Sequence, residues 1–309
     1  MTSEEPLLSA ALRIRLVEEK IIELYPTDLI QSPVHLSIGQ EAVAVGVCAA
    51  LEEDDLVFPN YRGHSFFLAR GGDLGQFFAE LMGRQAGISK GKAGSMHLAD
   101  PSHGLMGASA VVASTISHAA GAALAERIRP GGKSGRIFVP VFGDGATEQG
   151  VFFETLNFAA LHQLPVLFVM EDNSLAVHTS LAERQAFSIP KVCAAFGIEY
   201  FEELDGFDPG SVATTAKRAI ESIKSSGGPS FLVVKTMRYK EHVGPGEDFD
   251  AGYRQAAEVD AWKARDPLQE LDRFGDDLVS SMRDEIESAV EFALSSPVSH
   301  DRELLTDVL

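Results

Sequence analysis

The sequence predicts an α/β fold in which a mostly parallel sheet is flanked by helices, with helical extensions at the N- and C-termini. Between residues 113 and 236, short apolar runs alternate with segments of helical spacing. Strands that are buried on both faces and alternate with helices form parallel sheets joined by right-handed crossovers. The first 25 residues and residues 251–298 show helical patterns without strands between them. With 309 residues, of which 45% are hydrophobic, we expect a single domain over 1–309, with 251–309 as a helical extension.

Helices are expected where apolar residues recur at a spacing of three or four, and strands where apolar runs are short and continuous. The helical segments are 7–25, 40–52, 73–82, 113–127, 148–162, 188–196 and 209–225. The strand segments are 136–142, 165–170, 199–201 and 230–236. The stretch 83–110 holds six glycines without a clear period and, like 240–250, is expected to be a loop. Long loops inside compact domains tend to be functional.

Composition argues against several classes of partner and location. The net charge of −19 disfavours nucleic acid or an anionic membrane as a partner, because both are polyanions. The two cysteines, Cys48 and Cys193, give no disulfide framework or zinc site and fit a reducing compartment. The N-terminus lacks the basic start and apolar run of a signal peptide, and the apolar stretches are too short to span a bilayer. We therefore expect a cytoplasmic protein.

Polar residues stand at the ends of two consecutive predicted strands. The strand 136–142 runs into Gly143-Asp144-Gly145, and the strand 165–170 runs into Glu171-Asp172-Asn173. The interval from Asp144 to Asn173 is 29 residues (173 − 144), enough for a strand–helix–strand unit. Because parallel strands end at the same edge of a sheet, a carboxylate and an amide oxygen would meet there. Mg²⁺ prefers such oxygens together with phosphate oxygens and water. The glycines permit a tight turn, and the positive N-terminal end of the following helix suits a diphosphate.

This pairing resembles the thiamine diphosphate motif, and further stretches extend the resemblance to nearly the whole chain, from about His35 to Val308. The chain is similar to the alpha subunit of the first component of heterotetrameric 2-oxo acid dehydrogenase complexes, which include the pyruvate, branched-chain 2-oxo acid and acetoin dehydrogenases. The resemblance implies a thiamine diphosphate-binding fold. The stretches that carry it are His35-Leu36-Ser37-Ile38-Gly39-Gln40-Glu41-Ala42, Tyr61-Arg62-Gly63-His64, Gly91-Lys92-Ala93-Gly94-Ser95-Met96-His97, Gly143-Asp144-Gly145-Ala146 with Asn173, and Arg238-Tyr239-Lys240-Glu241-His242.

The resemblance also implies the roles of individual residues toward thiamine diphosphate and Mg²⁺. The metal ligands would be Asp144, Asn173 and the backbone carbonyl of Leu175, and the catalytic residues His35, His64 and His242. The cofactor would be bound by Tyr61, Arg62, Ala110, Val112, Gly143, Asp144, Gly145, Ala146, Asn173, Leu175, Arg238 and His242. Structural roles stay open for several of these side chains: Arg62 as a surface ion pair, His35 and His64 as core or capping histidines, and His242 as an exposed loop residue.

A second subunit follows from the same resemblance. In this family a separate beta subunit supplies the glutamate that activates the cofactor, so we expect an alpha-two beta-two assembly and no activity from this chain alone. A lipoyl-bearing acyltransferase is a further candidate partner. The sequence departs from the family pattern at Val243, where members under phosphorylation control have Ser, at Asp172, where Asn is frequent, and at Ala110, often Gly. The phosphorylation switch is therefore expected to be absent.

Oxidative decarboxylation of a 2-oxo acid, with acyl transfer to a lipoyl group, is the leading function. The alternative is a split-subunit non-oxidative carboligase or transketolase-like transferase, because the cofactor-binding residues are shared among these reactions. A non-catalytic interaction subunit is disfavoured by the intact Asp144 and Asn173. A nicotinamide dehydrogenase fits poorly, since no Gly-x-Gly-x-x-Gly follows the first strand-like segment. The substrate itself is not determined by the sequence.

Overall fold

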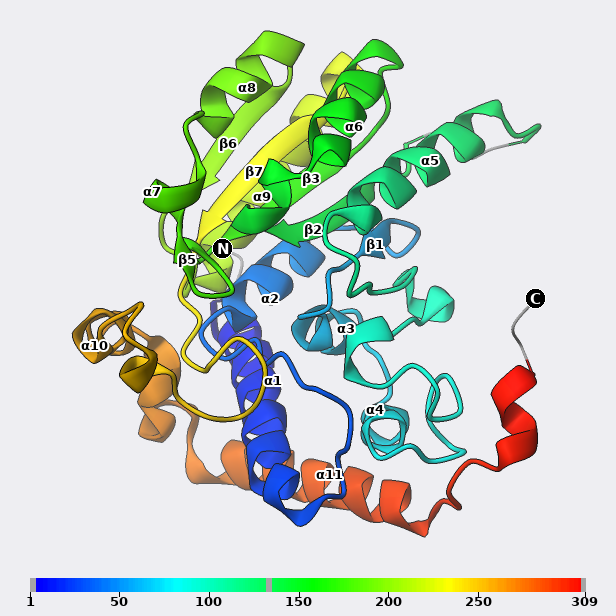
Figure 1. The fold of residues 1–309 in the computed structure, drawn as a ribbon, viewed down its shortest axis with the longest axis vertical. Helices are drawn as coiled ribbons and strands as arrows, with labels where there is room; N and C mark the ends of the chain where they lie inside the picture. The colour runs from blue at the N-terminus through cyan, green and yellow to red at the C-terminus, as the bar shows by residue number, and fades with distance from the viewer. Residues whose placement is uncertain (1–3, 132–134, 307–309) are drawn as a thin grey trace.

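The computed structural model describes residues 4–131 and 135–306, and a parallel sheet lies at its centre (Figure 1). In these residues the sheet has five strands, in the spatial order β1 (Leu56–Phe58), β2 (Phe138–Gly143), β3 (Leu167–Asp172), β7 (Ser230–Lys235) and β6 (Glu199–Glu203). Every neighbouring pair of these strands is parallel. The predicted parallel α/β sheet is therefore confirmed.

Helices cover both faces of the sheet, since alternate residues of each strand point to opposite sides. On one face, α2 (Glu41–Ala50) and α9 (Pro209–Ser226) pack together and share a core with Val169 of β3. On the other face, α5 (Ser114–Ile128), α6 (Gly150–Leu161) and α8 (Ile189–Phe196) share a second core with Phe168. Burial on both faces explains why the central strands are continuous apolar runs in the sequence.

The predicted terminal extensions form part of a further layer below α2 (Figure 1). This layer holds α1 (Glu4–Leu24), α3 (His64–Ala69), α4 (Leu74–Leu81) and α11 (Asp276–Ser295), with α10 (Ala256–Lys263) at its side. α11 packs against α4 and α1. Arg15 of α1 forms buried ion pairs with Glu41 of α2 and, at 2.9 Å, with Asp266. The N-terminal helix is thus tied both to the sheet layers and to the C-terminal extension.

The sequence prediction missed several short elements around the site: β1, α3, the antiparallel ribbon of β4 (Leu175–Ala176) and β5 (Thr179–Ser180), and the helix α7 (Leu181–Arg184). β1 has only three residues, too few to show a period, and α3 has six. β1 lies at the edge of the sheet, where Phe58 is paired with Pro140 of β2. The segment 59–63 therefore emerges beside the end of β2.

The ends of the elements around the motif also differ from the prediction. The helix expected at 148 begins at Gly150, because a 3₁₀ turn, η4 (Asp144–Glu148), comes first. β3 continues through Asp172, so that Glu171 belongs to the strand. The stretch 83–110 contains two 3₁₀ turns and otherwise no helix, as expected of a loop. Residues Asp307 and Val308, which the resemblance included, lie outside the described residues.

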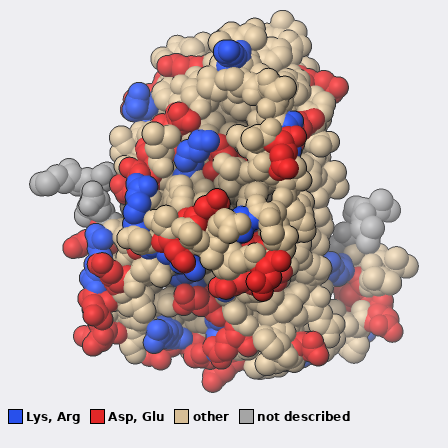
Figure 2. All heavy atoms as spheres, turned by 60° about the vertical axis from the view of Figure 1, so that its left-hand side comes forward, with Lys and Arg blue, Asp and Glu red and all other residues tan. Residues whose placement is uncertain are grey.

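Charged side chains are unevenly distributed over the surface. On the face in Figure 2, acidic side chains gather over the lower half, with basic side chains among them. The high net negative charge is therefore carried in part by this side of the molecule. None of the helices in the described residues has the length and apolar character needed to cross a membrane.

Candidate functional site

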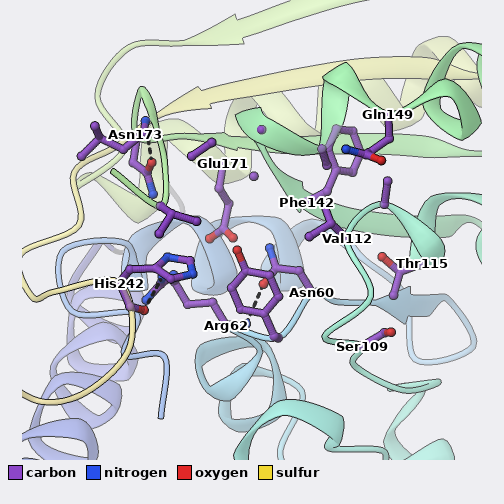
Figure 3. Close-up of a pocket in the computed structure, with 18 of the residues that line it drawn as sticks. Asn60, Arg62, Ser109, Val112, Thr115, Phe142, Gln149, Glu171, Asn173 and His242 are labelled. Atoms are coloured by element: carbon purple, nitrogen blue, oxygen red, sulfur yellow. Dashed lines mark hydrogen bonds between the residues drawn. The ribbon is translucent and has the colours of Figure 1, made fainter. Parts of the chain in front are cut away.

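A cavity of about 260 Å³ lies where β1, β2 and β3 reach their carboxyl ends (Figure 3). Ligands of open parallel sheets bind at this edge, because the loops that follow the strands converge there. Polar side chains from these strand ends face apolar side chains of the segment that precedes α5. The lining residues used below are Gln40, Asn60, Tyr61, Arg62, Val111, Val112, Gly143, Gly145, Ala146, Glu171, Asn173, Leu175, Arg238 and His242.

Gly145 lets two backbone segments approach each other beside the cavity. A Cβ atom on Gly145 would lie 2.7 Å from the Cβ of Ala176, which is closer than real contacts allow. Gly143, in contrast, has no atom within 4 Å of the place where its Cβ would stand. The glycines thus have different uses: Gly145 permits close packing against the β4–β5 ribbon, and Gly143 leaves open space at the cavity wall.

Asp144 is almost wholly buried, with 1% of its surface exposed. Its Oδ2 accepts a hydrogen bond from Arg184 of α7 (Leu181–Arg184), whereas its Oδ1 is buried without a hydrogen-bond partner. Burial, together with the nearby Asp172, raises the pKa of Asp144 to about 6, and the charge of Arg184 offsets part of this effect. An unpaired buried carboxylate oxygen is costly, and a cation bound to it would remove the cost.

Asn173 is held by hydrogen bonds on both sides of its amide. Its Nδ2 donates to Oε1 of Gln40 at 2.9 Å, and its Oδ1 accepts from the backbone N–H of Leu175 at 3.1 Å. Leu175 begins the antiparallel ribbon of β4 (Leu175–Ala176) and β5 (Thr179–Ser180), and Ser174 before it has a positive φ of 62°. The tight turn brings Asn173 and Leu175 to the same cavity.

The oxygen atoms of Asp144, Asn173 and the backbone carbonyl of Leu175 are ligands that suit a hard cation. In the described residues, no three His, Cys, Asp or Glu side chains come together as a metal site. A cation at this edge would therefore depend on one carboxylate, Asp144, with the amide oxygen of Asn173 and a backbone carbonyl. Mg²⁺ is bound in this way when phosphate oxygens and water complete its coordination.

Glu171 is a cavity residue that the sequence analysis did not assign to the site. It is 2% exposed and points toward Asn60 and Arg62 (Figure 3). Burial raises its pKa to about 7, although hydrogen bonds with Gln40 and Asn60 and the charge of Arg62 act in the opposite direction. The sequence did carry a signal for this role: Glu171 directly follows the apolar run of β3, and a glutamate is seldom buried unless it has a specific partner.

Arg62 is a buried arginine at the wall of the cavity, not a surface ion pair. It is 5% exposed, and its Nη1 and Nη2 donate to the carbonyl oxygens of Leu36 (2.6 Å) and His242 (3.2 Å). Burial lowers its pKa to about 10, so the guanidinium stays charged at neutral pH. Arg62 therefore links three segments at the cavity and supplies a positive charge next to it.

Three aromatic rings meet beside this guanidinium. The centroid of His35 lies 4.5 Å from that of Tyr61 and 5.1 Å from that of His242, and Tyr61 and His242 are 5.7 Å apart. Burial and the charge of Arg62 lower the pKa of His35 to about 3 and that of His242 to about 4. Both imidazoles are neutral at pH 7. Tyr61 and His242 line the cavity.

Arg238 is the second buried cation of the cavity. It is 2% exposed and pairs with Asp248 at 3.1 Å, and its Nη2 donates to the carbonyl oxygen of Val177 at 3.3 Å. Burial lowers its pKa. It thus connects the segment that carries His242 to the turn that follows Leu175.

Four of the predicted site residues, Asp144, His35, His64 and Ala110, are not among the residues that line the cavity. His64 is completely buried outside the cavity, where its ring nitrogens contact Glu18 (3.0 Å) and Ser95 (2.6 Å). Val112 lines the cavity and is 47% exposed, whereas Ala110 is not among its lining residues.

The chain is similar to a known family and to several named proteins over most of its length. A family model described as "Dehydrogenase E1 component" matches residues 10–299. The alpha subunit of the acetoin:2,6-dichlorophenolindophenol oxidoreductase of Bacillus subtilis (strain 168) is 38% identical, over 96% of this chain and 90% of the relative. The alpha subunits of the pyruvate dehydrogenase E1 components of Rhizobium meliloti (strain 1021) and Zymomonas mobilis (strain ATCC 31821 / ZM4 / CP4) are 35% and 38% identical. They are matched over 96% of this chain and over 87% and 86% of their own lengths.

Proposed function

Because this chain belongs to the dehydrogenase E1 component family, we propose that it is the alpha subunit of a thiamine diphosphate- and Mg²⁺-dependent 2-oxo acid or acetoin dehydrogenase. The observation that carries the proposal is the position of Asp144 and Asn173: each directly follows one of two neighbouring parallel strands, beside a cavity with two buried arginines. The reactions named in its relatives, of acetoin and of pyruvate, define the substrate classes to test.

The metal would be held by Asp144, Asn173 and the carbonyl oxygen of Leu175. The unpartnered Oδ1 of Asp144 supports this assignment, because a divalent cation would supply the missing interaction. Gln40 and Arg184 hold the other polar atoms of the two side-chain ligands. The metal would in turn bind phosphate oxygens of the cofactor.

The diphosphate would lie against the metal and the positive side of the cavity. Arg62 and Arg238 are charged, buried and fixed by protein carbonyl groups, so that little side-chain freedom is lost when an anion binds. Tyr61 and His242 line the same cavity and would donate hydrogen bonds to the diphosphate. Buried arginines at this wall would help a highly acidic chain to bind an anionic cofactor.

Thiamine diphosphate, when bound, supplies an electron sink for cleavage of the bond next to the carbonyl carbon of the substrate. The residues of this chain would bind and orient it: Val112 would support its apolar part, and neutral His242 and His35 would hold or move a proton near the substrate. His64 would position Glu18 and Ser95 without touching the substrate, since it is completely buried.

The remaining catalytic group would come from a partner. The alpha-subunit naming of the relatives implies a beta subunit, and we propose that this subunit contributes the activating glutamate in an alpha-two beta-two tetramer. A lipoyl-bearing acyltransferase would then accept the acyl group from the oxidative reaction.

The proposal can be tested on the chain co-purified with its beta subunit. With thiamine diphosphate and Mg²⁺ present, CO₂ release and ferricyanide reduction would be followed with a panel of 2-oxo acids, and ferricyanide reduction alone with acetoin. Substrate-dependent ferricyanide reduction is the expected result. CO₂ release without reduction, or turnover only after an aldehyde or ketose is added, would contradict it and indicate the carboligase or transketolase-like alternative.

A further inference from the structure

The side chain of Arg184 contacts the carboxylate proposed to bind the metal, although the two residues are 40 positions apart in the chain. Its side chain is 8% exposed. Nη2 donates to Oδ2 of Asp144, Nη1 donates to Oε1 of Glu148, and Nε donates to the carbonyl oxygen of Thr179 at 3.1 Å. Each nitrogen of the guanidinium therefore has a protein acceptor, and the group is fixed in one orientation.

The contact leaves the two oxygens of Asp144 in different situations. Oδ2 is bound by Arg184, and Oδ1 is buried without a hydrogen-bond donor. A carboxylate free to rotate about its last bond could turn its unbound oxygen away from the position of the cation. The hydrogen bond from Arg184 opposes this rotation, because rotation would break a charge-assisted hydrogen bond. Oδ1 is consequently the atom available to a cation.

Gln185 extends the contact to the rest of the η4 turn. Its Nε2 donates to Oγ1 of Thr147 at 2.7 Å and to Oε1 of Glu148 at 2.6 Å, and it lies 3.3 Å from the carbonyl oxygen of Asp144. α7, which carries Arg184, begins directly after β5, where Ser180 and Glu183 form a capping box. Since β5 pairs with β4, the same short segment holds the turn of Asp144 and the ribbon that begins at Leu175.

From this geometry we infer that Arg184 is a positioning residue for the divalent cation: it holds Oδ2 of Asp144, directs Oδ1 toward the cation, and fixes the η4 turn relative to the β4–β5 ribbon. The inference rests on the proposed function, in which Asp144 and the carbonyl of Leu175 bind the metal. Carboxylate ligands of metals are generally hydrogen-bonded by neighbouring groups, whose removal weakens metal binding by about 10–100-fold. Arg184 does not itself touch metal, cofactor or substrate in this arrangement.

The test measures metal binding directly. Mn²⁺ is titrated into the co-purified alpha–beta complex in the presence of thiamine diphosphate, and free Mn²⁺ is followed by its electron paramagnetic resonance signal. The variants are Arg184→Gln, Arg184→Lys and Asp144→Asn. Arg265→Gln is the matched control, because Arg265 also pairs with an aspartate, Asp205 at 2.8 Å, but its side chain is 58% exposed.

Arg184→Gln is expected to weaken Mn²⁺ binding by about 10–100-fold, whereas Arg265→Gln leaves it unchanged and Asp144→Asn abolishes it. Equal or tighter Mn²⁺ binding by Arg184→Gln, with binding lost in Asp144→Asn, would overturn the inference and leave the proposed function intact. Equal binding by the wild type and Asp144→Asn would instead overturn the proposed metal site. If Arg184→Gln does not assemble, Arg184→Lys decides the matter. A lysine lacks the planar fork that reaches Asp144, Glu148 and the carbonyl oxygen of Thr179 from three nitrogens, so the affinity for Mn²⁺ should fall by at least about threefold, and an unchanged affinity would contradict the inference.

Discussion

The cavity has two unlike ends. At what we call the polar end, Arg62 and Glu171 line the cavity and Asp144 lies beside it; their exposed fractions are 5%, 2% and 1%, and each is held by neighbouring protein groups. At the apolar rim, formed by Val111 and Val112, the side chains are 68% and 47% exposed. One end carries fixed, buried charged groups, and the other leaves apolar surface in solvent. The difference supports the proposal that this chain forms the diphosphate half of a site and that a partner covers the rest.

Asp144→Asn should have the largest effect, because it removes the one carboxylate of the polar end that is proposed to bind the metal. We expect kcat/KM of the alpha–beta complex to fall by at least about 10³-fold, or roughly 4 kcal/mol of transition-state stabilisation. CO₂ release at saturating cofactor would measure the loss, and circular dichroism would check the fold. A loss of less than tenfold in a folded variant would show that Asp144 is dispensable.

Glu171→Gln tests whether the buried charge of Glu171 at the polar end lowers the free energy of unfolding. Since the folded state raises the pKa of Glu171 from 4.5 to about 7, the folded state holds the proton more tightly than the unfolded state, and stability is lost as the pH rises through this window. The variant, which carries no charge, should be more stable than the wild type at pH 8 by up to roughly 3 kcal/mol and by less than about 1 kcal/mol at pH 5.

Urea unfolding of the cofactor-free protein at the two pH values measures this difference. A gain that is the same at pH 5 and pH 8 would mean that the charge of Glu171 is not responsible for it.

Arg62→Lys keeps a positive charge at the polar end and removes the fork that reaches two carbonyl groups. We expect the affinity for thiamine diphosphate to fall about 10–30-fold, which corresponds to roughly 2 kcal/mol. Quenching of protein fluorescence or calorimetry on the alpha–beta complex would measure it. An affinity equal to that of the wild type would indicate that only the charge of Arg62 matters.

Val111→Asp is expected to have the smallest effect, and it acts at the apolar rim. A charge placed where the partner covers apolar surface should weaken association with the beta subunit by about tenfold or more, because it is desolvated without an opposite charge. Leu204→Asp is the matched control, since Leu204 is similarly exposed, at 61%, and does not line the cavity. Association is measured by sedimentation. If both variants weaken association with the beta subunit equally, the apolar rim is not part of the interface.

The sequence was sufficient for the parts of the fold and site that depend on local pattern. Continuous apolar strands, helices between them, and polar residues directly after two strands predicted the parallel sheet, and the structure brings the neighbourhoods of Asp144 and Asn173 to one edge. β1 was missed because three residues carry no period, although it delivers Tyr61 and Arg62 to the cavity.

Contacts that depend on tertiary packing could not be predicted in the same way. The pairing of Arg184 with Asp144 joins residues 40 apart through a four-residue helix that has no strong sequence signal. The burial of Glu171 between Gln40, Asn60 and Arg62 requires three separate segments to meet. His64 was grouped with the catalytic histidines by its position in a motif, whereas only the structure places it between Glu18 and Ser95.

The central claim is that this chain forms the diphosphate half of the site and depends on a partner for the rest. The most direct test is CO₂ release from a 2-oxo acid, at saturating thiamine diphosphate and Mg²⁺, by this chain alone and after the beta subunit is added. We predict no turnover above background for the isolated chain and turnover that rises with added beta subunit to saturation. Turnover by the chain alone, in a preparation shown by mass spectrometry to contain no beta subunit, would contradict the account.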